Sequence, residues 1–91
     1  MYSFVYLDRN QWYGVTQNGQ ALWFSSEDQA MRAAEAHWRQ EGRAEYAIVT
    51  DRRNYLWYGR PGQGWCSDRS FPSAAMEDLY PRNAQWRRWG G

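Results

Sequence analysis

The tripeptide Trp-Tyr-Gly occurs twice in this sequence, at residues 12–14 and at residues 57–59. Each tripeptide lies in a short run of aromatic and β-branched residues, which favour β-strands. The two runs flank the longest stretch with helical character. Because neighbouring side chains in a strand point to opposite faces, the Trp and the Tyr of each tripeptide must lie on opposite faces of a sheet. If a helix covers one face, aromatic side chains must also lie on the other face.

The length of 91 residues allows one domain, since a second core could not be buried in so short a chain. We predict a single compact α+β domain over residues 1–81 and an Arg/Trp-containing C-terminal tail over residues 82–91. Aromatic residues make up 19% of the chain, with 7 Trp, 7 Tyr and 3 Phe. This is more than a core of this size needs, so we expect some of these rings at a surface.

Strand and turn signals alternate along the chain. Asp8-Arg9-Asn10 is typical of a turn, and Asn18-Gly19 between two apolar runs is a strong hairpin signal. On alternation, Tyr2, Phe4 and Tyr6 share one face of the first strand, and Val5 and Leu7 share the other. The predicted strands are residues 2–7, 11–16, 21–24, 46–50 and 55–59, with Trp65-Cys66 as an optional sixth strand at an edge.

One long helix is predicted over Glu27–Glu41. Ser26 with Gln29 fits a capping box, and Gly42 is a typical C-terminal stop. Its apolar stripe consists of Ala30, Ala33, Ala34, His37 and Trp38. A short C-terminal helix is predicted from Ser73 to Tyr80. The expected fold is therefore α+β: an antiparallel sheet of about five strands, in the order β-β-β-α-β-β, with the main helix packed on one face.

A shift of 45 residues aligns the two Trp-Tyr-Gly tripeptides and also aligns Ala30-Met31 with Ala75-Met76. This alignment suggests two degenerate copies of a strand–strand–helix unit, but so few identities could also be coincidence.

Several of these motifs occur together in a known class of domains. Over residues 2–59 the chain carries Trp12-Tyr13-Gly14-Val15, the Asn18-Gly19 turn, an Ala-rich helix after Ser26 and Trp57-Tyr58-Gly59. This pattern resembles small bacterial YegP-like domains of unknown function. The resemblance implies an α+β fold and carries over no catalytic residue, and the Arg/Trp tail departs from it. Short phage-encoded inhibitors, anti-CRISPR proteins among them, share only the size and the compact α+β build.

Candidate catalytic groups are few. His37 lies one helical turn before Glu41, and the pair could act as an acid/base unit, but a helical contact at the edge of the core is the commoner arrangement. Cys66 could be a nucleophile if a base lay nearby, but a partly buried structural thiol is commoner. One His and one Cys cannot supply a metal site. We therefore predict a protein that is not an enzyme, with no catalytic residues, no metal and no cofactor.

All 11 basic residues are arginine, and the net charge is only +1. Arginine residues outnumber acidic residues from Tyr46 onward, whereas acidic residues outnumber arginines over residues 1–45. Trp, Tyr and Arg are enriched in the cores of protein interfaces, where Lys is rare. We therefore predict a small protein-binding inhibitor or adaptor, and the sharpest form of this prediction is an inhibitor encoded by a phage or mobile element. The predicted partner-binding residues are Tyr13, Arg52, Arg53, Tyr55, Trp57, Tyr58, Arg60, Arg87 and Arg88.

Two alternatives stay open at this point. Rings on an open sheet face, with arginines beside them, could bind single-stranded nucleic acid. A structural homodimer is the second alternative. The single cysteine, Cys66, and an N-terminus without a signal peptide favour a cytoplasmic location. No apolar run reaches the ~18–20 residues of a membrane span, so no membrane partner is expected.

Overall fold

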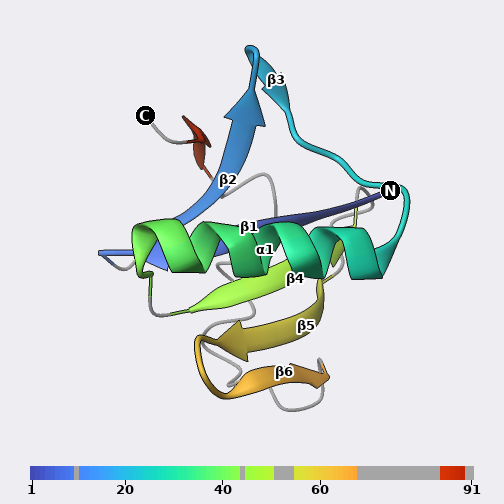
Figure 1. The fold of residues 1–91 in the computed structure, drawn as a ribbon. Coiled ribbons are helices and arrows are strands. Elements are labelled where there is room, and N and C mark those ends of the chain that lie inside the picture. The colour runs from blue at the N-terminus through green and yellow to red at the C-terminus, as the bar shows by residue number, and fades with distance from the viewer. Residues whose placement is uncertain (10, 44, 51–54, 68–84, 90–91) are drawn as a thin grey trace.

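The computed structural model describes residues 1–9, 11–43, 45–50, 55–67 and 85–89, without the side chains of Tyr55, Leu56 and Ser67. These residues form an α+β fold in which a single helix packs on one face of a sheet (Figure 1). The predicted fold class is confirmed, and the sheet is more extensive than predicted. Its elements are β1 (Tyr2–Asp8), β2 (Gln11–Gln17), β3 (Gln20–Ala21), α1 (Glu27–Glu41), β4 (Tyr46–Thr50), β5 (Tyr55–Arg60), β6 (Gly64–Ser67) and β7 (Gln85–Arg88).

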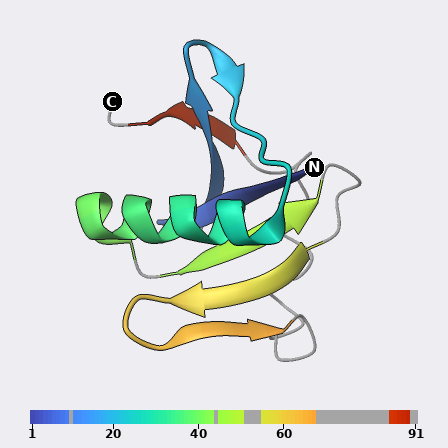
Figure 2. The same cartoon turned by 45° about the vertical axis from the view of Figure 1, so that its right-hand side comes forward.

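The antiparallel strands follow the order β3-β2-β1-β4-β5-β6, and β7 pairs with β2 in parallel. The central pair, β1 and β4, places Phe4 opposite Ile48 and Tyr6 opposite Tyr46. In both ribbon views α1 crosses the sheet over these central strands (Figure 2). The most deeply buried side chains therefore come from β1 and β4, where both neighbours and the helix exclude water.

The ends of α1 match the prediction because both caps form. Ser26 has an extended backbone, with φ −138°, and its hydroxyl accepts a hydrogen bond from the Gln29 N–H at 3.1 Å. The Gln29 side chain reaches back to Ser25, where it accepts from the N–H and from the hydroxyl. At the other end Gly42 adopts the left-handed conformation, with φ 67°, and donates to the Trp38 carbonyl at 2.9 Å. The predicted bounds Glu27–Glu41 are confirmed.

Side chains alternate between two apolar clusters, as the strand pattern predicts. Trp12 and Tyr58 pack on the face away from the helix, whereas Tyr13 and Trp57 pack on the helix side. The buried helix-side cluster is Phe4, Tyr6, Val15, Ala30, Ala34, Tyr46 and Ile48. The buried cluster on the opposite face is Val5, Trp12, Ala47 and Val49.

The second face is not an open aromatic surface. Trp12 is only 2% exposed and Val5 is fully buried. Within the described part of the chain, the large hydrophobic side chain left exposed is that of Met1. Among the described residues no aromatic side chain is fully exposed, and rings outside the buried clusters, such as Tyr58 and Trp65, are half-buried at their edges.

The glycine of each Trp-Tyr-Gly tripeptide lies under a tryptophan from the neighbouring strand. Gly14 pairs with Trp86 of β7, and Gly59 pairs with Trp65 of β6. A Cβ atom added to Gly14 would lie 2.5 Å from the Trp86 ring, and one added to Gly59 would lie 2.7 Å from the Trp65 ring. An aromatic ring laid over a strand glycine restores the packing that the missing side chain would have provided. These two tryptophans are therefore part of the sheet's own packing.

The two halves of the sheet have a similar order of strands, but equivalent side chains of the two Trp-Tyr-Gly tripeptides point to opposite faces. Outward from the β1–β4 pair, β2 and β3 lie on one side, and β5 and β6 lie on the other. However, Tyr13 faces the helix and Tyr58 faces away from it. A shift of 45 residues therefore aligns the letters of the two tripeptides but exchanges the faces of their side chains, which argues against a simple structural repeat.

The third strand is shorter than the predicted 21–24. After Leu22 the chain leaves β2 and crosses to the start of β1, where Phe24 and Tyr2 exchange backbone hydrogen bonds of 2.7 and 2.8 Å. The Ser3 hydroxyl donates to the Leu22 carbonyl at 2.6 Å across this crossing. Residues 22–24 therefore divide their backbone hydrogen bonds between β2 and β1, and for this reason β3 ends at Ala21.

The C-terminal stretch departs furthest from expectation. Residues 85–88, within the predicted tail, form β7 and belong to the sheet. Trp89 follows β7 and packs against the helix-side cluster, in edge contact with Phe4 and His37 at centroid distances of 5.7 and 5.4 Å. A boundary at residue 81 therefore does not separate residues 85–89 from the sheet. The predicted helix from Ser73 to Tyr80 lies outside the described residues.

Candidate interaction surface

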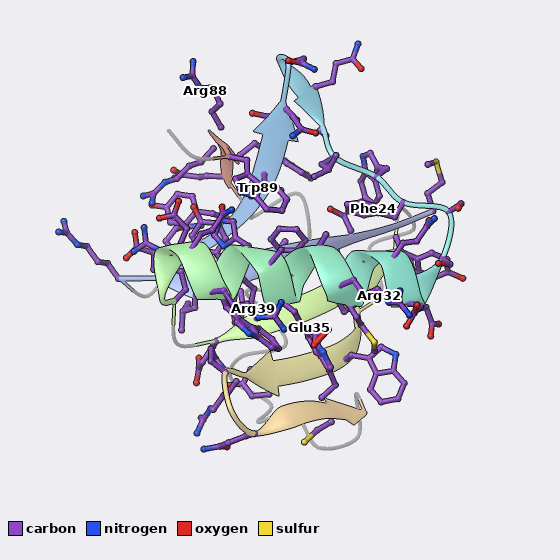
Figure 3. The ribbon with its side chains drawn as sticks, viewed as in Figure 1. Phe24, Arg32, Glu35, Arg39, Arg88 and Trp89 are labelled. Atoms are coloured by element: carbon purple, nitrogen blue, oxygen red, sulfur yellow. The ribbon has the colours of Figure 1, made fainter. Side chains whose placement is uncertain are left out.

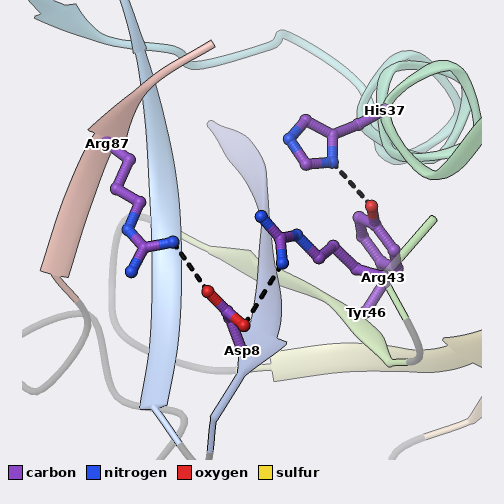
Figure 4. Close-up of polar contacts among 5 residues, drawn as sticks. All are labelled: Asp8, His37, Arg43, Tyr46 and Arg87. Carbon is purple, nitrogen blue, oxygen red and sulfur yellow. Dashed lines mark hydrogen bonds and ion pairs between the residues drawn. The ribbon is translucent and has the colours of Figure 1, made fainter. Parts of the chain in front are cut away.

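Asp8, at the end of β1, is the centre of a charged group that joins three parts of the fold. Its carboxylate accepts a hydrogen bond from Arg87 of β7 at 2.8 Å and forms an ion pair with Arg43, just after α1, at 3.2 Å (Figure 4). The hydrogen bond from Arg87, followed by the positive charge of Arg43, lowers the pKa of Asp8 below its usual value. The carboxylate therefore stays ionised and holds both guanidinium groups in place.

Tyrosine rings support the same two arginines. The guanidinium carbon of Arg87 lies 3.4 Å from the centroid of Tyr13, and that of Arg43 lies 5.5 Å from the centroid of Tyr6. The two rings stack on each other at 5.7 Å. A guanidinium group stacked on a ring and tied to a carboxylate loses little further freedom when its remaining N–H groups bind a partner.

Two further arginines adjoin this group in sequence: Arg9 follows Asp8, and Arg88 follows Arg87 on β7. Arg9 and Arg88 are exposed, and neither forms an ion pair with any residue that the structure describes. Arg87 and Arg88 point to opposite sides of β7, because Arg87 pairs with Val15 of the helix-side cluster and Arg88 is the next residue. We call Asp8, Arg9, Arg43, Arg87 and Arg88 the arginine surface. These five residues comprise four arginines and one carboxylate, and the acidic residues Glu41 and Glu45 lie close to Arg43 and β1, so they reduce the local excess of positive charge.

The structure divides the predicted partner-binding residues between two places. Tyr13 and Arg87 meet at the arginine surface. Tyr58 and Arg60 meet on the other half of the sheet, where the Arg60 guanidinium lies 5.8 Å from the Tyr58 centroid and pairs with Glu45 at 2.9 Å. Tyr13 and Tyr58 therefore lie on opposite faces of the sheet, and the role of these residues in binding a partner stays a prediction.

The other predicted residues do not complete either place. Trp57 lies on the helix side, half-buried, and its indole N–H donates to Glu27 at 3.3 Å. Arg88 is exposed on β7, where it follows Arg87 and points to the opposite side of the strand. Arg52, Arg53 and the Tyr55 side chain lie outside the described part of the structure. Sequence reasoning missed Asp8, Arg9 and Arg43, because the turn signal at Asp8-Arg9 and the position of Arg43 after a helix end have ordinary structural explanations.

His37 belongs to the core. It is 2% exposed, and its Nδ1 atom lies 2.6 Å from the hydroxyl of Tyr46 (Figure 4). Burial lowers the pKa of His37 and raises that of Tyr46, so both groups are neutral near pH 7. The hydrogen-bonding partner of the imidazole is thus Tyr46 of β4, whereas the sequence suggested a contact with Glu41. A substrate could not reach this histidine without displacing the rings around it.

Cys66 is exposed, which corrects the expectation of a partly buried thiol. It lies on β6, the last strand in the sheet order, where water reaches the side chain. Among the described residues, no three His, Cys, Asp or Glu side chains are grouped closely enough to hold a metal ion. Within the same ranges, no helix has the length and the apolar character that crossing a bilayer would require.

Comparison of the chain with protein-family models, with curated proteins and with solved structures finds no match. The resemblance to YegP-like domains therefore stays an expectation from the sequence.

Proposed function

We propose that this protein is a small, non-catalytic, cytoplasmic domain that binds an acidic surface of another protein. It would act as an inhibitor or an adaptor, by covering that surface of the partner protein without changing it chemically. The sharpest form of this hypothesis is an inhibitor encoded by a phage or mobile element, in the manner of anti-CRISPR proteins.

The observation that carries this proposal is the shared carboxylate of Asp8. One negative charge holds two arginines, Arg43 and Arg87, and both are only partly exposed, at 31% and 41% of their side-chain surface. Their outward N–H groups are therefore fixed in direction while the local charge remains positive. Exposed Arg9 and Arg88 add charge that can steer an acidic partner toward this surface.

The position of His37 favours binding over catalysis. A general acid or base must reach the reacting atoms of a substrate, within hydrogen-bond distance or through one water. His37 is surrounded by Tyr6, Phe4, Tyr46 and Trp89, and its hydrogen-bonding capacity is directed toward Tyr46. These contacts explain the histidine as a packed core residue.

Nucleic acid is the second candidate, and the arginine surface alone favours it. Stacking of unpaired bases needs accessible rings. Trp12 is buried, and Tyr13 and Tyr58 each lie beneath an arginine. A nucleic-acid ligand would therefore contact arginines through its phosphates, and its binding affinity would fall steeply as the salt concentration rises.

A pull-down from host lysate tests the proposal, with tagged protein and a lysate divided into nuclease-treated and untreated halves. We expect one discrete protein to be retained in both halves. Material that disappears on nuclease treatment would support the nucleic-acid alternative. Retention of no other molecule, together with a stable dimer in sedimentation, would support the homodimer.

A matched pair of variants locates the surface. Arg9→Gln/Arg88→Gln removes two exposed positive charges from the arginine surface, and Arg32→Gln/Arg39→Gln removes two exposed positive charges from the helix. We expect the first pair to weaken capture and the second to leave it unchanged. Equal capture by both double variants would show that the partner binds elsewhere.

A further inference from the structure

A small depression lies where the β2–β3 hairpin meets the end of β7. It has a volume of about 300 Å³ and is lined by Thr16, Gln17, Asn18, Gly19, Arg88 and Trp89. Its two walls come from opposite ends of the chain, and β7 joins them by pairing Arg88 with Thr16. This volume is at the low end for ligand sites, so it suits one side chain better than a cofactor.

The hairpin wall has a well-defined shape. Asn18 and Gly19 are both left-handed, with φ 55° and φ 78°, as a two-residue hairpin turn requires. Gln17 and Asn18, both exposed, supply side-chain amide groups, and Thr16 supplies a hydroxyl. These groups are neutral hydrogen-bond donors and acceptors.

The opposite wall combines a charged group with a fixed ring. The backbone N–H of Trp89 donates to the Thr16 carbonyl at 2.9 Å, and the indole N–H donates to Gln40 of α1 at 2.9 Å. The side chain of Arg88 is exposed and makes no ion pair or hydrogen bond with a residue that the structure describes, whereas its backbone pairs with Thr16 in the sheet. Figure 3 shows Arg88 projecting away from the ribbon, whereas Trp89 turns toward α1.

We propose that this depression, which we call the hairpin site, binds a carboxylate group of the partner protein. The Arg88 guanidinium would pair with the carboxylate, the hairpin amides would donate to its free oxygen positions, and the Trp89 ring would contact the adjoining methylene groups. The inference rests on the proposed function, and it adds the chemical group recognised and the residues that recognise it.

The charge of the hairpin site favours a carboxylate over a phosphate. Arg88 is the one charged residue among its six lining residues, so the site matches a single negative charge. The planar fork of a guanidinium group also fits the two oxygens of a carboxylate. A protein could supply this group from an Asp or Glu side chain or from its C-terminus.

Nuclear magnetic resonance titration of the full chain tests this inference with three probes. The first is an acetylated and amidated tetrapeptide of sequence Gly-Glu-Glu-Gly, and the second is tetraglycine with a free C-terminal carboxylate. The third is an oligothymidylate of eight nucleotides. For the peptide that fits, we expect saturable shifts of the Gln17, Asn18, Gly19 and Trp89 backbone amides, with a dissociation constant on the order of 1–10 mM for one charged contact.

Arg88→Gln is the test variant, and Arg39→Gln, exposed on α1, is the matched control. We expect Arg88→Gln to weaken peptide binding about tenfold, as loss of a charge-assisted hydrogen bond predicts, and Arg39→Gln to leave it unchanged. Equal binding by both variants, or shifts outside the hairpin site, would overturn the inference. Stronger Arg88-dependent binding of the oligothymidylate would overturn the assignment to a carboxylate.

The titration and the pull-down can fail independently. If wild type and Arg88→Gln capture the same protein from lysate equally well, the proposed function is supported, but the hairpin site has no part in it. If peptide binding depends on Arg88 but no protein is captured, the carboxylate site is supported and the proposed function is contradicted.

Discussion

The guanidinium carbon of Arg87 lies 3.4 Å from the centroid of the Tyr13 ring, and the same guanidinium donates to Asp8 at 2.8 Å. Tyr13 belongs to β2 and Asp8 to β1, whereas Arg87 belongs to β7. One side chain thus attaches the last strand to both strands of the first hairpin. Its neighbour, Arg88, makes no such contact among the described residues.

Replacing Arg87 should loosen β7 while replacing Arg88 should not. In Arg87→Gln the stacking on Tyr13 and the bond to Asp8 are lost, so β7 should open more often. Hydrogen exchange at the Trp89 backbone amide, which donates to Thr16, measures this opening. We expect faster exchange in Arg87→Gln than in wild type or Arg88→Gln. Identical exchange in the two variants would show that β7 is held by other contacts.

Acidification should destabilise the fold through His37. Burial is the main cause of its lowered pKa; the positive charge of Arg43 acts in the same direction and the negative charge of Glu41 opposes it. Because the folded pKa lies below the ordinary 6.5, the unfolded chain binds the proton first as the pH falls. The contribution of neutral His37 to stability is therefore complete above pH 6.5 and declines as the pH drops toward the folded pKa.

Urea unfolding at a series of pH values between 7 and 5 checks this prediction. Wild type should lose stability across that range, and His37→Gln should show a flatter profile whatever its absolute stability. Asp8 titrates at lower pH, since its own pKa lies below 3.8, so it does not contribute in this window. Parallel profiles for the two proteins would contradict the assignment.

The tryptophan over Gly14 makes that position intolerant of a side chain. In Gly14→Ala the new methyl carbon would lie 2.5 Å from the Trp86 ring, so the ring must shift. We expect a loss of about 1–3 kcal/mol in the free energy of unfolding, which is typical of overpacking. In the Trp86→Ala background the same change should cost much less, because the clash is gone. An equal cost in both backgrounds would place the strain elsewhere. Denaturant titration measures all four proteins.

Trp89 should be worth more to stability than its position near the end of the sequence suggests. Its ring contacts Phe4 and His37, and its indole N–H donates to Gln40. Trp→Ala in a full core costs ~3–5 kcal/mol, and Trp89 is only half-buried, so we expect about 2–3 kcal/mol for Trp89→Ala. Trp89→Phe, which keeps a ring, should cost less. A near-neutral Trp89→Ala in urea unfolding would show that the packing is dispensable.

The local parts of the fold could be predicted because their signals lie within a few residues. Ser26 and Gly42 mark the ends of α1, and Asn18-Gly19 marks the hairpin. Each of these residues has a conformation or a side-chain bond that few others provide. Alternation likewise predicted that Trp12 and Tyr13 would lie on opposite faces.

The pairing of β7 with β2 could not be predicted in the same way. Gln85–Arg88 is short and polar, and its hydrogen bonds go to a strand near the start of the chain. Its clearest signal was indirect: Gly14 lies inside β2, and a glycine within a strand leaves a gap that a ring from a neighbouring strand can fill.

The candidate site depended on similar long-range contacts. Tyr13 and Arg87 were both predicted to bind a partner, but nothing local indicated that they contact each other or that Asp8 and Arg43 complete the group. Alternation also implied that Trp57 and Tyr58 could not share one surface, and the structure separates them. The spacing of residues along a strand determines which face of the sheet each side chain occupies. The residues that an arginine contacts depend instead on how the strands are arranged in the fold.

The parallel pairing of β2 with β7 has a consequence for synthesis. During translation the first hairpin, α1 and β4–β6 all emerge before residues 85–88. Until then the edge of β2 that β7 will occupy keeps unpaired backbone groups, and an unpaired edge can bind a strand from another chain. Ribosome-bound nascent chains ending before Gln85 should therefore associate more readily than chains that include Trp89.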